Sequence, residues 1–333
     1  MNSSEDSSLI MLINSINSKF SLIAAIVLTI VGVIGNPIVF FILTKSRFRN
    51  VSIFRYSIVS VVNDSFVLIT MWPYNFPEAF QMNTSSISCK LSQYFGYLFY
   101  QFCSWIIVLS SIDRLLSVKY ATRFQFRNKL KYQALALSVI FVVILFLDIP
   151  FYSYFDIHVQ SNNSTLCATN DIFIQFYIDL TNLLISTIIP FFIMVLCTIL
   201  IGHTLITQKS RLMENRRTYK KELQYVKVLY ALDAFFLICN LPFCIQQLIS
   251  DGFTINNKPY FFQTFIFNVT NSIIYIQNAF AFFVYFISNK GFRKYFLSII
   301  IPNNRVGDFT ISTTNLTRTR NDRQGNRSIQ EMD

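Results

Sequence analysis

Seven apolar segments divide this chain, and each is close to or longer than the ~20 residues that a helix needs to cross a bilayer. Their ranges are 21–44, 53–75, 91–117, 134–154, 174–206, 224–249 and 261–287. Hydrophobic residues make up 53% of the sequence and charged residues only 14%, a balance outside the range of soluble globular proteins. We therefore expect an all-α membrane protein whose seven transmembrane helices form one bundle.

The parts outside the spans are short. Residues 1–20 form an N-terminal arm, 21–298 hold the seven-helix domain, and 299–333 are poor in apolar residues, which favours a disordered tail. Residues 288–297 alternate basic with large apolar side chains at helical spacing. This pattern predicts a short amphipathic eighth helix on the membrane surface, with a frayed end of the seventh helix as the alternative.

The basic residues predict the orientation. Of the 28 Lys and Arg residues, 25 lie beside the loops after spans one, three and five or after the last span. The positive-inside rule then places the N-terminus outside the cell and the tail in the cytosol. The net charge of +11 reflects this bias, and no nucleic-acid partner is expected. Glycosylation sequons on the predicted outer side begin at Asn2, Asn83, Asn162 and Asn163.

Several short motifs follow one another along the spans. They are Gly35-Asn36, Asp64, Cys89, Asp113-Arg114-Leu115, Pro190, Cys239-Asn240-Leu241-Pro242, Tyr285 and Phe292-Arg293. Together they resemble the rhodopsin-like (class A) G-protein-coupled receptors over the whole membrane domain. The resemblance implies a plasma-membrane receptor for an extracellular ligand, with a heterotrimeric G protein as its cytosolic partner and arrestin and a receptor kinase as further partners.

The resemblance also implies an intracellular switch. Asp113 and Arg114 match the family's switch pair, although Leu115 replaces the usual Tyr. Glu222 lies where the family places the acidic residue that Arg114 contacts in the resting state. The alternative is that Glu222 is a solvated residue following Lys221.

Two prolines are expected to act as hinges. Pro190 and Pro242 each remove an intrahelical hydrogen bond and should kink their helices, which would allow helix six to move outward. Tyr285 belongs to the seventh-helix motif of the family, although Phe282 replaces the Pro before it. Asn240 replaces the Trp of the sixth-helix motif, so the activation relay is expected to be atypical.

Asp64 lies in the middle of the second span, where an ionisable residue is a functional candidate. In the family this Asp binds sodium together with polar residues of helices three and seven. Here Cys103 and Ala281 stand where Ser and Asn are expected. We therefore expect no cofactor, and predict a water-linked polar core of Asp64 with Asn36 and Asn278.

Cys89 and Cys167 are the two cysteines on the predicted outer side, whereas the other four lie inside spans. The resemblance implies that they form a disulfide bond between the second extracellular loop and the third helix. Two unpaired outer thiols are the alternative.

The ligand class follows from what the outer half contains. Gly96 stands where amine receptors carry an acidic counter-ion, and the upper seventh helix has no Lys for retinal. An excess of acids such as Asp179, together with aromatic residues such as Trp72 and Tyr97, favours a neuropeptide with a basic or amidated aromatic end. The same features occur as interfacial belts in membrane proteins generally, so a small-molecule chemoreceptor is the alternative.

Two other classes are disfavoured. The acids Asp64 and Asp233 within spans are compatible with an ion-coupled transporter, but the sequence has no inverted repeat. An enzyme is not expected, because His158 and His203 lie near opposite membrane faces and no nucleophile motif is present.

Overall fold

A computed structural model describes residues 3–76, 85–119, 130–159, 165–169, 171–207, 216–252 and 260–301. The chain divides into two units, residues 1–290 and 291–333. The first unit contains the transmembrane helices. The described residues of the second unit, 291–301, lie in or directly after α13 (Lys290–Ile300), whose basic and apolar residues separate onto different faces.

The described elements are almost entirely helical, as the apolar segments predict. In chain order they are α1 (Ser3–Leu43), α2 (Ser46–Arg49), α3 (Ser52–Asn75), α4 (Ser86–Lys119), α5 (Leu130–Leu147), α6 (Ile149–Tyr154), β1 (Asp156–Val159), β2 (Thr165–Ala168), α7 (Ile172–Thr181), the π-helix η3 (Asn182–Ile188), α8 (Ile189–Thr207), α10 (Arg216–Gly252), α11 (Tyr260–Ala279) and α12 (Ala281–Ser288). Six described helical stretches are long and apolar enough to span a bilayer, and α11 with α12 makes a bent seventh.

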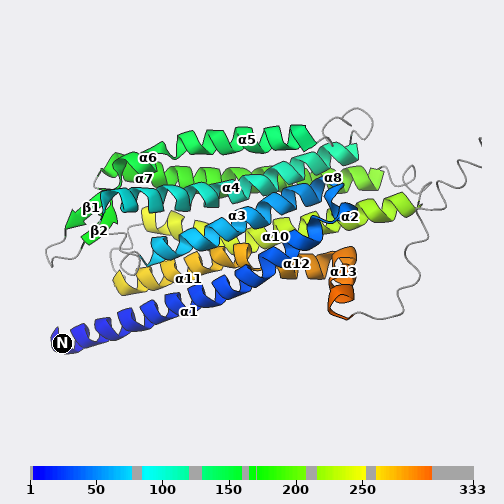
Figure 1. Cartoon of the computed structure of the whole chain (residues 1–333). Coiled ribbons are helices and arrows are strands. Elements are labelled where there is room, and N and C mark those ends of the chain that lie inside the picture. Colours follow the sequence, from blue (N-terminus) through cyan, green and yellow to red (C-terminus); the bar gives the residue numbers. More distant parts are fainter. Residues whose placement is uncertain are drawn as a thin grey trace, which may run out of the picture. The chain divides into compact units, whose positions relative to one another are not determined.

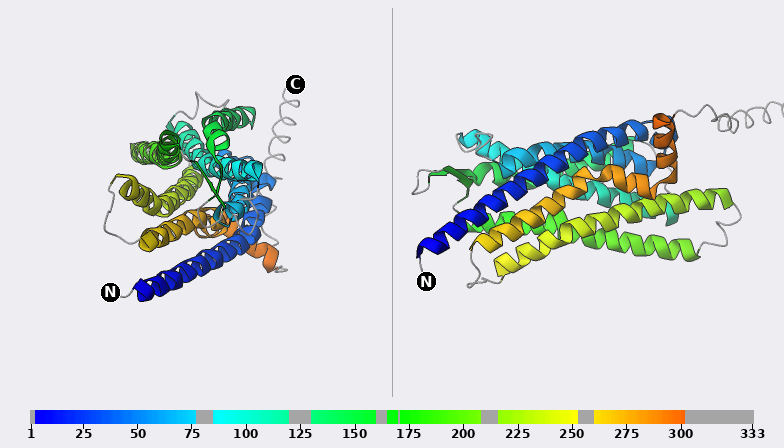
Figure 2. Two further views of the ribbon diagram at one scale, coloured as in Figure 1. Left: turned by 90° about the vertical axis from the view of Figure 1, so that its left-hand side faces the viewer. Right: turned by 90° about the horizontal axis from the view of Figure 1, so that it is seen from below.

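The first unit is a bundle of helices that lie side by side (Figure 1). α4 lies at the centre of the packing, because it contacts α3, α5, α6, η3, α8 and α10. The end-on view shows α1 and α5 on different sides of the bundle (Figure 2). A short antiparallel hairpin of β1 and β2 marks one end of the bundle, which is called the hairpin end below.

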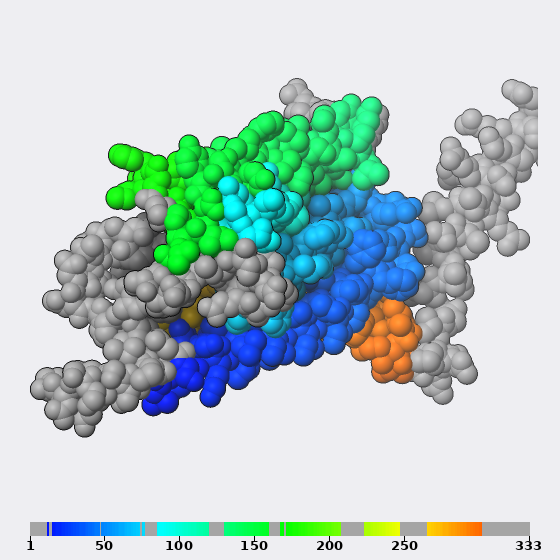
Figure 3. All heavy atoms as spheres, turned by 60° about the vertical axis from the view of Figure 1, so that its left-hand side comes forward, coloured from blue at the N-terminus to red at the C-terminus, as the bar shows by residue number. Residues whose placement is uncertain are grey.

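The outer faces of the helices are apolar. Large side chains such as Ile69, Phe146 and Phe192 are each more than half exposed. α5 buries only Gln133 and Ile144. In the space-filling view the side chains of α1 and α3 pack against each other along the bundle (blue, Figure 3). Such a surface is stable against lipid tails and unfavourable in water.

Three spans are not single regular helices. The fourth breaks at Asp148, between α5 and α6, and the fifth contains the wide turns of η3 directly before Ile189-Pro190. The sequence predicted one continuous seventh span, but the structure bends it by 55° between α11 and α12, at Phe280. No proline causes this bend, which is why the sequence did not reveal it.

Helix α1 begins at Ser3, so the backbone of the expected N-terminal arm continues the first span as a helix. Hydropathy marks only the apolar part of a helix, whereas backbone hydrogen bonds can extend the helix through polar residues. The expected tail, beginning at residue 299, lies outside the described residues from residue 302 onward.

Candidate functional site

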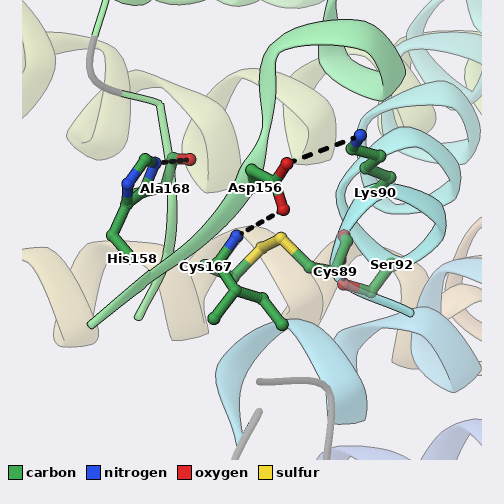
Figure 4. Close-up of a disulfide and its surroundings, with 8 residues drawn as sticks. Cys89, Lys90, Ser92, Asp156, His158, Cys167 and Ala168 are labelled. Carbon is green, nitrogen blue, oxygen red and sulfur yellow. Dashed lines mark hydrogen bonds and ion pairs between the residues drawn. A yellow bond between two sulfur atoms is a disulfide. The ribbon is translucent and has the colours of Figure 1, made fainter. Parts of the chain in front are cut away.

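The hairpin end is fixed to α4 by a disulfide bond between Cys89 and Cys167, as expected, with a Cα–Cα distance of 5.6 Å. Close by, Asp156 forms an ion pair with Lys90 at 3.7 Å (Figure 4). Its Oδ1 also accepts a 2.8 Å hydrogen bond from the backbone N–H of Ile157. This backbone donor, with a smaller contribution from Lys90, lowers the pKa of Asp156.

A cavity of about 40 Å³, called cavity A, opens between α3, α4, η3, α10 and α11 in the half of the bundle nearer the hairpin. It is lined by Val67, Thr70, Met71, Gly96, Tyr97, Tyr100, Asn182, Phe243, Asn271, Ile274 and Tyr275. None of these residues carries a formal charge. Gly96 at the wall provides no counter-ion, and the polar groups are neutral amides and hydroxyls. Cavity A therefore suits an uncharged group that forms hydrogen bonds.

Of the three residues predicted to line the ligand mouth, only Tyr97 borders cavity A, where its ring lies 4.3 Å from that of Phe151. The indole N–H of Trp72 instead donates to the hydroxyl of Thr29 in α1 at 2.8 Å. Asp179 accepts hydrogen bonds from Gln175 of its own helix. Neither side chain borders cavity A, and their role at the ligand mouth stays a prediction.

Asn240 connects cavity A to the centre of the bundle. Its Oδ1 accepts a 2.9 Å hydrogen bond from the hydroxyl of Tyr100. Its Nδ2 donates to Oε1 of Gln277 and to the backbone oxygen of Phe236. A residue in the position of the family's Trp therefore joins α4, α10 and α11.

The predicted polar core of Asn36, Asp64 and Asn278 comes together around Cys103. The Cys103 thiol lies 3.3 Å from Oδ1 of Asp64 and 3.5 Å from Oδ1 of Asn278. Asn36 donates to the backbone oxygen of Asn278 at 3.1 Å, which includes α1 in the group. The sequence identified three members of this core, but it treated Cys103 as a departure, whereas the thiol links them.

A second cavity of about 40 Å³, cavity B, lies beside Asp64 and is bordered also by Cys103, Ala281 and Tyr285. A sodium ion prefers hard oxygen ligands. Here a soft thiol already contacts the carboxylate, and the side chain of Ala281 offers no ligand atom. These residues do not fit the sodium site that the family resemblance implies.

At the end opposite the hairpin, Arg114 is 4% exposed and its guanidinium group lies 4.9 Å from the ring centre of Tyr225 in α10. Its neighbour Asp113 accepts a 2.5 Å hydrogen bond from Ser52 of α3, and Gln133 of α5 contacts the same hydroxyl. The two switch residues therefore contact different helices, Asp113 towards α3 and Arg114 towards α10.

Some of the predictions concern residues or side chains outside the described part of the chain, or a movement of a helix. The side chain of Glu222 lies outside the described side chains, although its backbone belongs to α10. The sequons at Asn2, Asn83, Asn162 and Asn163 lie outside the described residues. Pro190 and Pro242 lie at the start of α8 and within α10, and their role as hinges stays a prediction.

Sequence reasoning missed two buried polar contacts. Asp233 accepts hydrogen bonds from Ser111 and Thr198, and Gln101 donates to Asp148 at 3.0 Å. The signal for the first was present, since Asp233 is an acid within an apolar segment. The sequence does not say which helices surround such a residue, and therefore could not supply its partners.

Residues 35–285 match the family model described as 7 transmembrane receptor (rhodopsin family), which covers most of the chain. The chain belongs to this family. It is also 24% identical to the galanin receptor 2b of Danio rerio over 292 residues, covering 84% of this chain and 75% of that relative. The protein is thus a multi-pass membrane receptor that functions in signalling and not as an enzyme.

Proposed function

We propose that this receptor passes a signal from an extracellular ligand to a heterotrimeric G protein by outward movement of α10. The observation that carries the proposal is that α10 reaches both functional regions. Phe243 borders cavity A, whereas Tyr225 packs against Arg114 at the opposite end. Their separation of 18 positions corresponds to ~27 Å of helix, so one continuous helix reaches both regions.

The proposed ligand is a neuropeptide that places a small uncharged group, such as its terminal amide, in cavity A. The neutral amides of Asn182 and Asn271 in its wall support this, because they can both donate to and accept from an amide. Acids near the hairpin, such as Asp156 and Asp171, would attract basic residues of the peptide that stay outside the cavity. The similarity to a galanin receptor also supports a peptide.

A small-molecule chemoreceptor is the second proposal, and the size of cavity A favours it. A volume of about 40 Å³ without charged walls accommodates only a small neutral group. The two ligand classes differ in what else they need. A peptide should lose affinity when acids near the hairpin are neutralised, whereas a neutral small molecule should not.

The proposed orientation puts the N-terminus outside the cell and Arg114 in the cytosolic half, at the plasma membrane. The distribution of Lys and Arg supports it.

Asp64 acts in this proposal as the centre of a hydrogen-bonded core without sodium. Arrestin and a receptor kinase are proposed as partners of the Ser- and Thr-rich tail.

The proposal is tested by measuring G-protein activation in cells that express the receptor at their surface. Galanin and a library of amidated peptides serve as the first probes. Arg114→Ala should abolish the response, while Lys131→Ala, an exposed basic residue of α5, should retain it. An unchanged response of Arg114→Ala at equal surface expression would contradict the role of Arg114.

A further inference from the structure

Asp233, in the middle of α10, is only 5% exposed. Its Oδ1 accepts a hydrogen bond from Ser111 of α4 at 3.3 Å, and its Oδ2 accepts one from Thr198 of α8 at 3.0 Å. Each carboxyl oxygen therefore contacts a different neighbouring helix. One side chain joins three helices.

A second contact holds α8 and α10 together at the same level. The hydroxyl of Tyr230 donates to the backbone oxygen of Thr198 at 3.0 Å. A Cβ atom added to Gly202 would lie 3.3 Å from the Tyr230 oxygen, so the absence of a side chain there permits the close approach. Tyr230 precedes Asp233 by one helical turn, and both therefore project from similar faces of α10.

The surroundings of Asp233 make its hydrogen bonds costly to break. An apolar cluster of Ile107, Val108, Met194 and Phe236 packs between the same three helices. A polar group in such surroundings that loses its partners has no water to replace them. In the part of the chain that the structure describes, no basic side chain forms an ion pair with Asp233, so hydroxyl groups provide its polar contacts.

The position of these contacts relates them to the movement of α10. Ser111 precedes Arg114 by three residues, and Asp233 lies nine residues before Pro242. The contacts therefore lie between the expected hinge and the Arg114 end of the bundle. If α10 swings outward about Pro242, the carboxyl group of Asp233 must separate from both α4 and α8.

We propose that Asp233 holds α10 against α4 and α8 in the resting receptor, and that release of its two hydroxyl contacts is a step of activation. The inference rests on the proposed outward movement of α10. The hydroxyl of Ser111 also lies 3.0 Å from the backbone oxygen of Ile107 in its own helix. When α10 leaves, this hydroxyl can turn back to its own helix and is not left without a partner.

Four substitutions separate the hydrogen bonds from the charge. Asp233→Leu removes both acceptors but keeps the branched shape of the side chain, whereas Asp233→Asn keeps a group that accepts from and donates to hydroxyls. Ser111→Ala and Thr198→Val remove the donors one at a time. Each substitution is compared with the unsubstituted receptor without ligand.

Two measurements are made on each variant. The first is the distance between spin labels at Lys119→Cys in α4 and Lys227→Cys in α10, two exposed positions. The free cysteines of the described residues are buried, which favours labelling at the introduced sites. The second is ligand-free G-protein activation.

Asp233→Leu should shift the distances to longer values and raise ligand-free activation by about tenfold, in keeping with the loss of one to two net hydrogen bonds. Asp233→Asn should do neither. Ser111→Ala and Thr198→Val should each give a smaller rise and add nothing to Asp233→Leu, because they act on one contact. Should Asp233→Leu fail to fold, Ser111→Ala combined with Thr198→Val tests the same contacts.

Unchanged distances in Asp233→Leu, or in the Ser111→Ala and Thr198→Val double variant, would overturn the inference. Equal effects of Asp233→Asn and Asp233→Leu would also overturn it, since they would assign the effect to the charge. If the distances lengthen but no variant activates the G protein, the Asp233 contact is supported and the proposed coupling of α10 movement to the G protein is rejected. The two failures are therefore distinguishable.

Discussion

The break in the fourth span provides a quantitative test of the structure. Asp148 is fully buried there, and its Oδ1 accepts a 3.0 Å hydrogen bond from Nε2 of Gln101, which is also fully buried. Its other oxygen, Oδ2, and Oε1 of Gln101 have no hydrogen-bond partner among the described residues. When Asp148 is ionised both atoms are acceptors, so a donor in place of one of them would form a hydrogen bond between the two side chains.

Asp148→Asn supplies that donor. The amide keeps an acceptor for Gln101 and adds an N–H for its unpartnered oxygen. Since a buried polar atom without a partner costs about 1–3 kcal/mol, we expect Asp148→Asn to stabilise the receptor by about 1 kcal/mol. Asp148→Ala leaves the whole Gln101 amide without a partner and should destabilise it by about 2–3 kcal/mol. At roughly 2 °C per kcal/mol, the variants should differ in Tm by about 6–8 °C.

The assay is thermal unfolding of the purified receptor in detergent. Unfolding is monitored by the reaction of its buried thiols with a dye. Cys103, Cys197, Cys239 and Cys244 are buried in the folded state and become reactive on unfolding. A loss of Tm in Asp148→Asn as large as that in Asp148→Ala would refute the reasoning. It would mean that the charge of Asp148, and not its hydrogen bond with Gln101, stabilises this region.

Three further outcomes are expected. Glu222→Ala should raise ligand-free signalling severalfold, and an unchanged basal level would place the resting partner of Arg114 elsewhere. Cys89→Ser and Cys167→Ser should reduce surface receptor to the same degree, because each removes the one disulfide that joins the hairpin to α4, and unequal losses would contradict this. The folded-state pKa of Asp156 lies below its ordinary value of 3.8, so its stabilising contribution is present above that value and is lost as pH falls through the lower one. Below about pH 4 the stability of Asp156→Asn should therefore fall less steeply than that of the unsubstituted receptor, as measured by acid unfolding.

The fold could be predicted from the length and apolar character of the segments, because only helices satisfy the backbone inside a bilayer here. Irregularities within the spans were harder to foresee. The bend at Phe280 occurs without the proline that usually signals one. The break at Asp148 lies two residues before Pro150, which lacks the N–H that would continue the helix. Hydropathy reports where a segment lies in the membrane and carries little information on its local helix geometry.

The candidate site was predictable as a set of residues but not as a set of contacts. Asp64 and Arg114 stand out because buried charged residues are rare in apolar segments. The contact of Asp113 with Ser52 depends on the rotation of α3 against α4. The contact of the Trp72 indole with Thr29 of α1 depends likewise on the rotation of α3. Helix rotation is determined by packing of whole faces, which no single motif encodes.

Asn240 and Cys103, which depart from the family pattern, belong to one chain of hydrogen bonds. Tyr100 donates to Asn240, which donates to Gln277. Gln277 donates to the sulfur of Cys103, which donates to Asp64. Each intermediate group must accept one hydrogen bond and donate the next, so that the bonds polarise one another. An indole has a donor but no acceptor, so a Trp in place of Asn240 could not accept from Tyr100 and would interrupt the chain. Asn240 thus gives the wall of cavity A a continuous polar connection to Asp64.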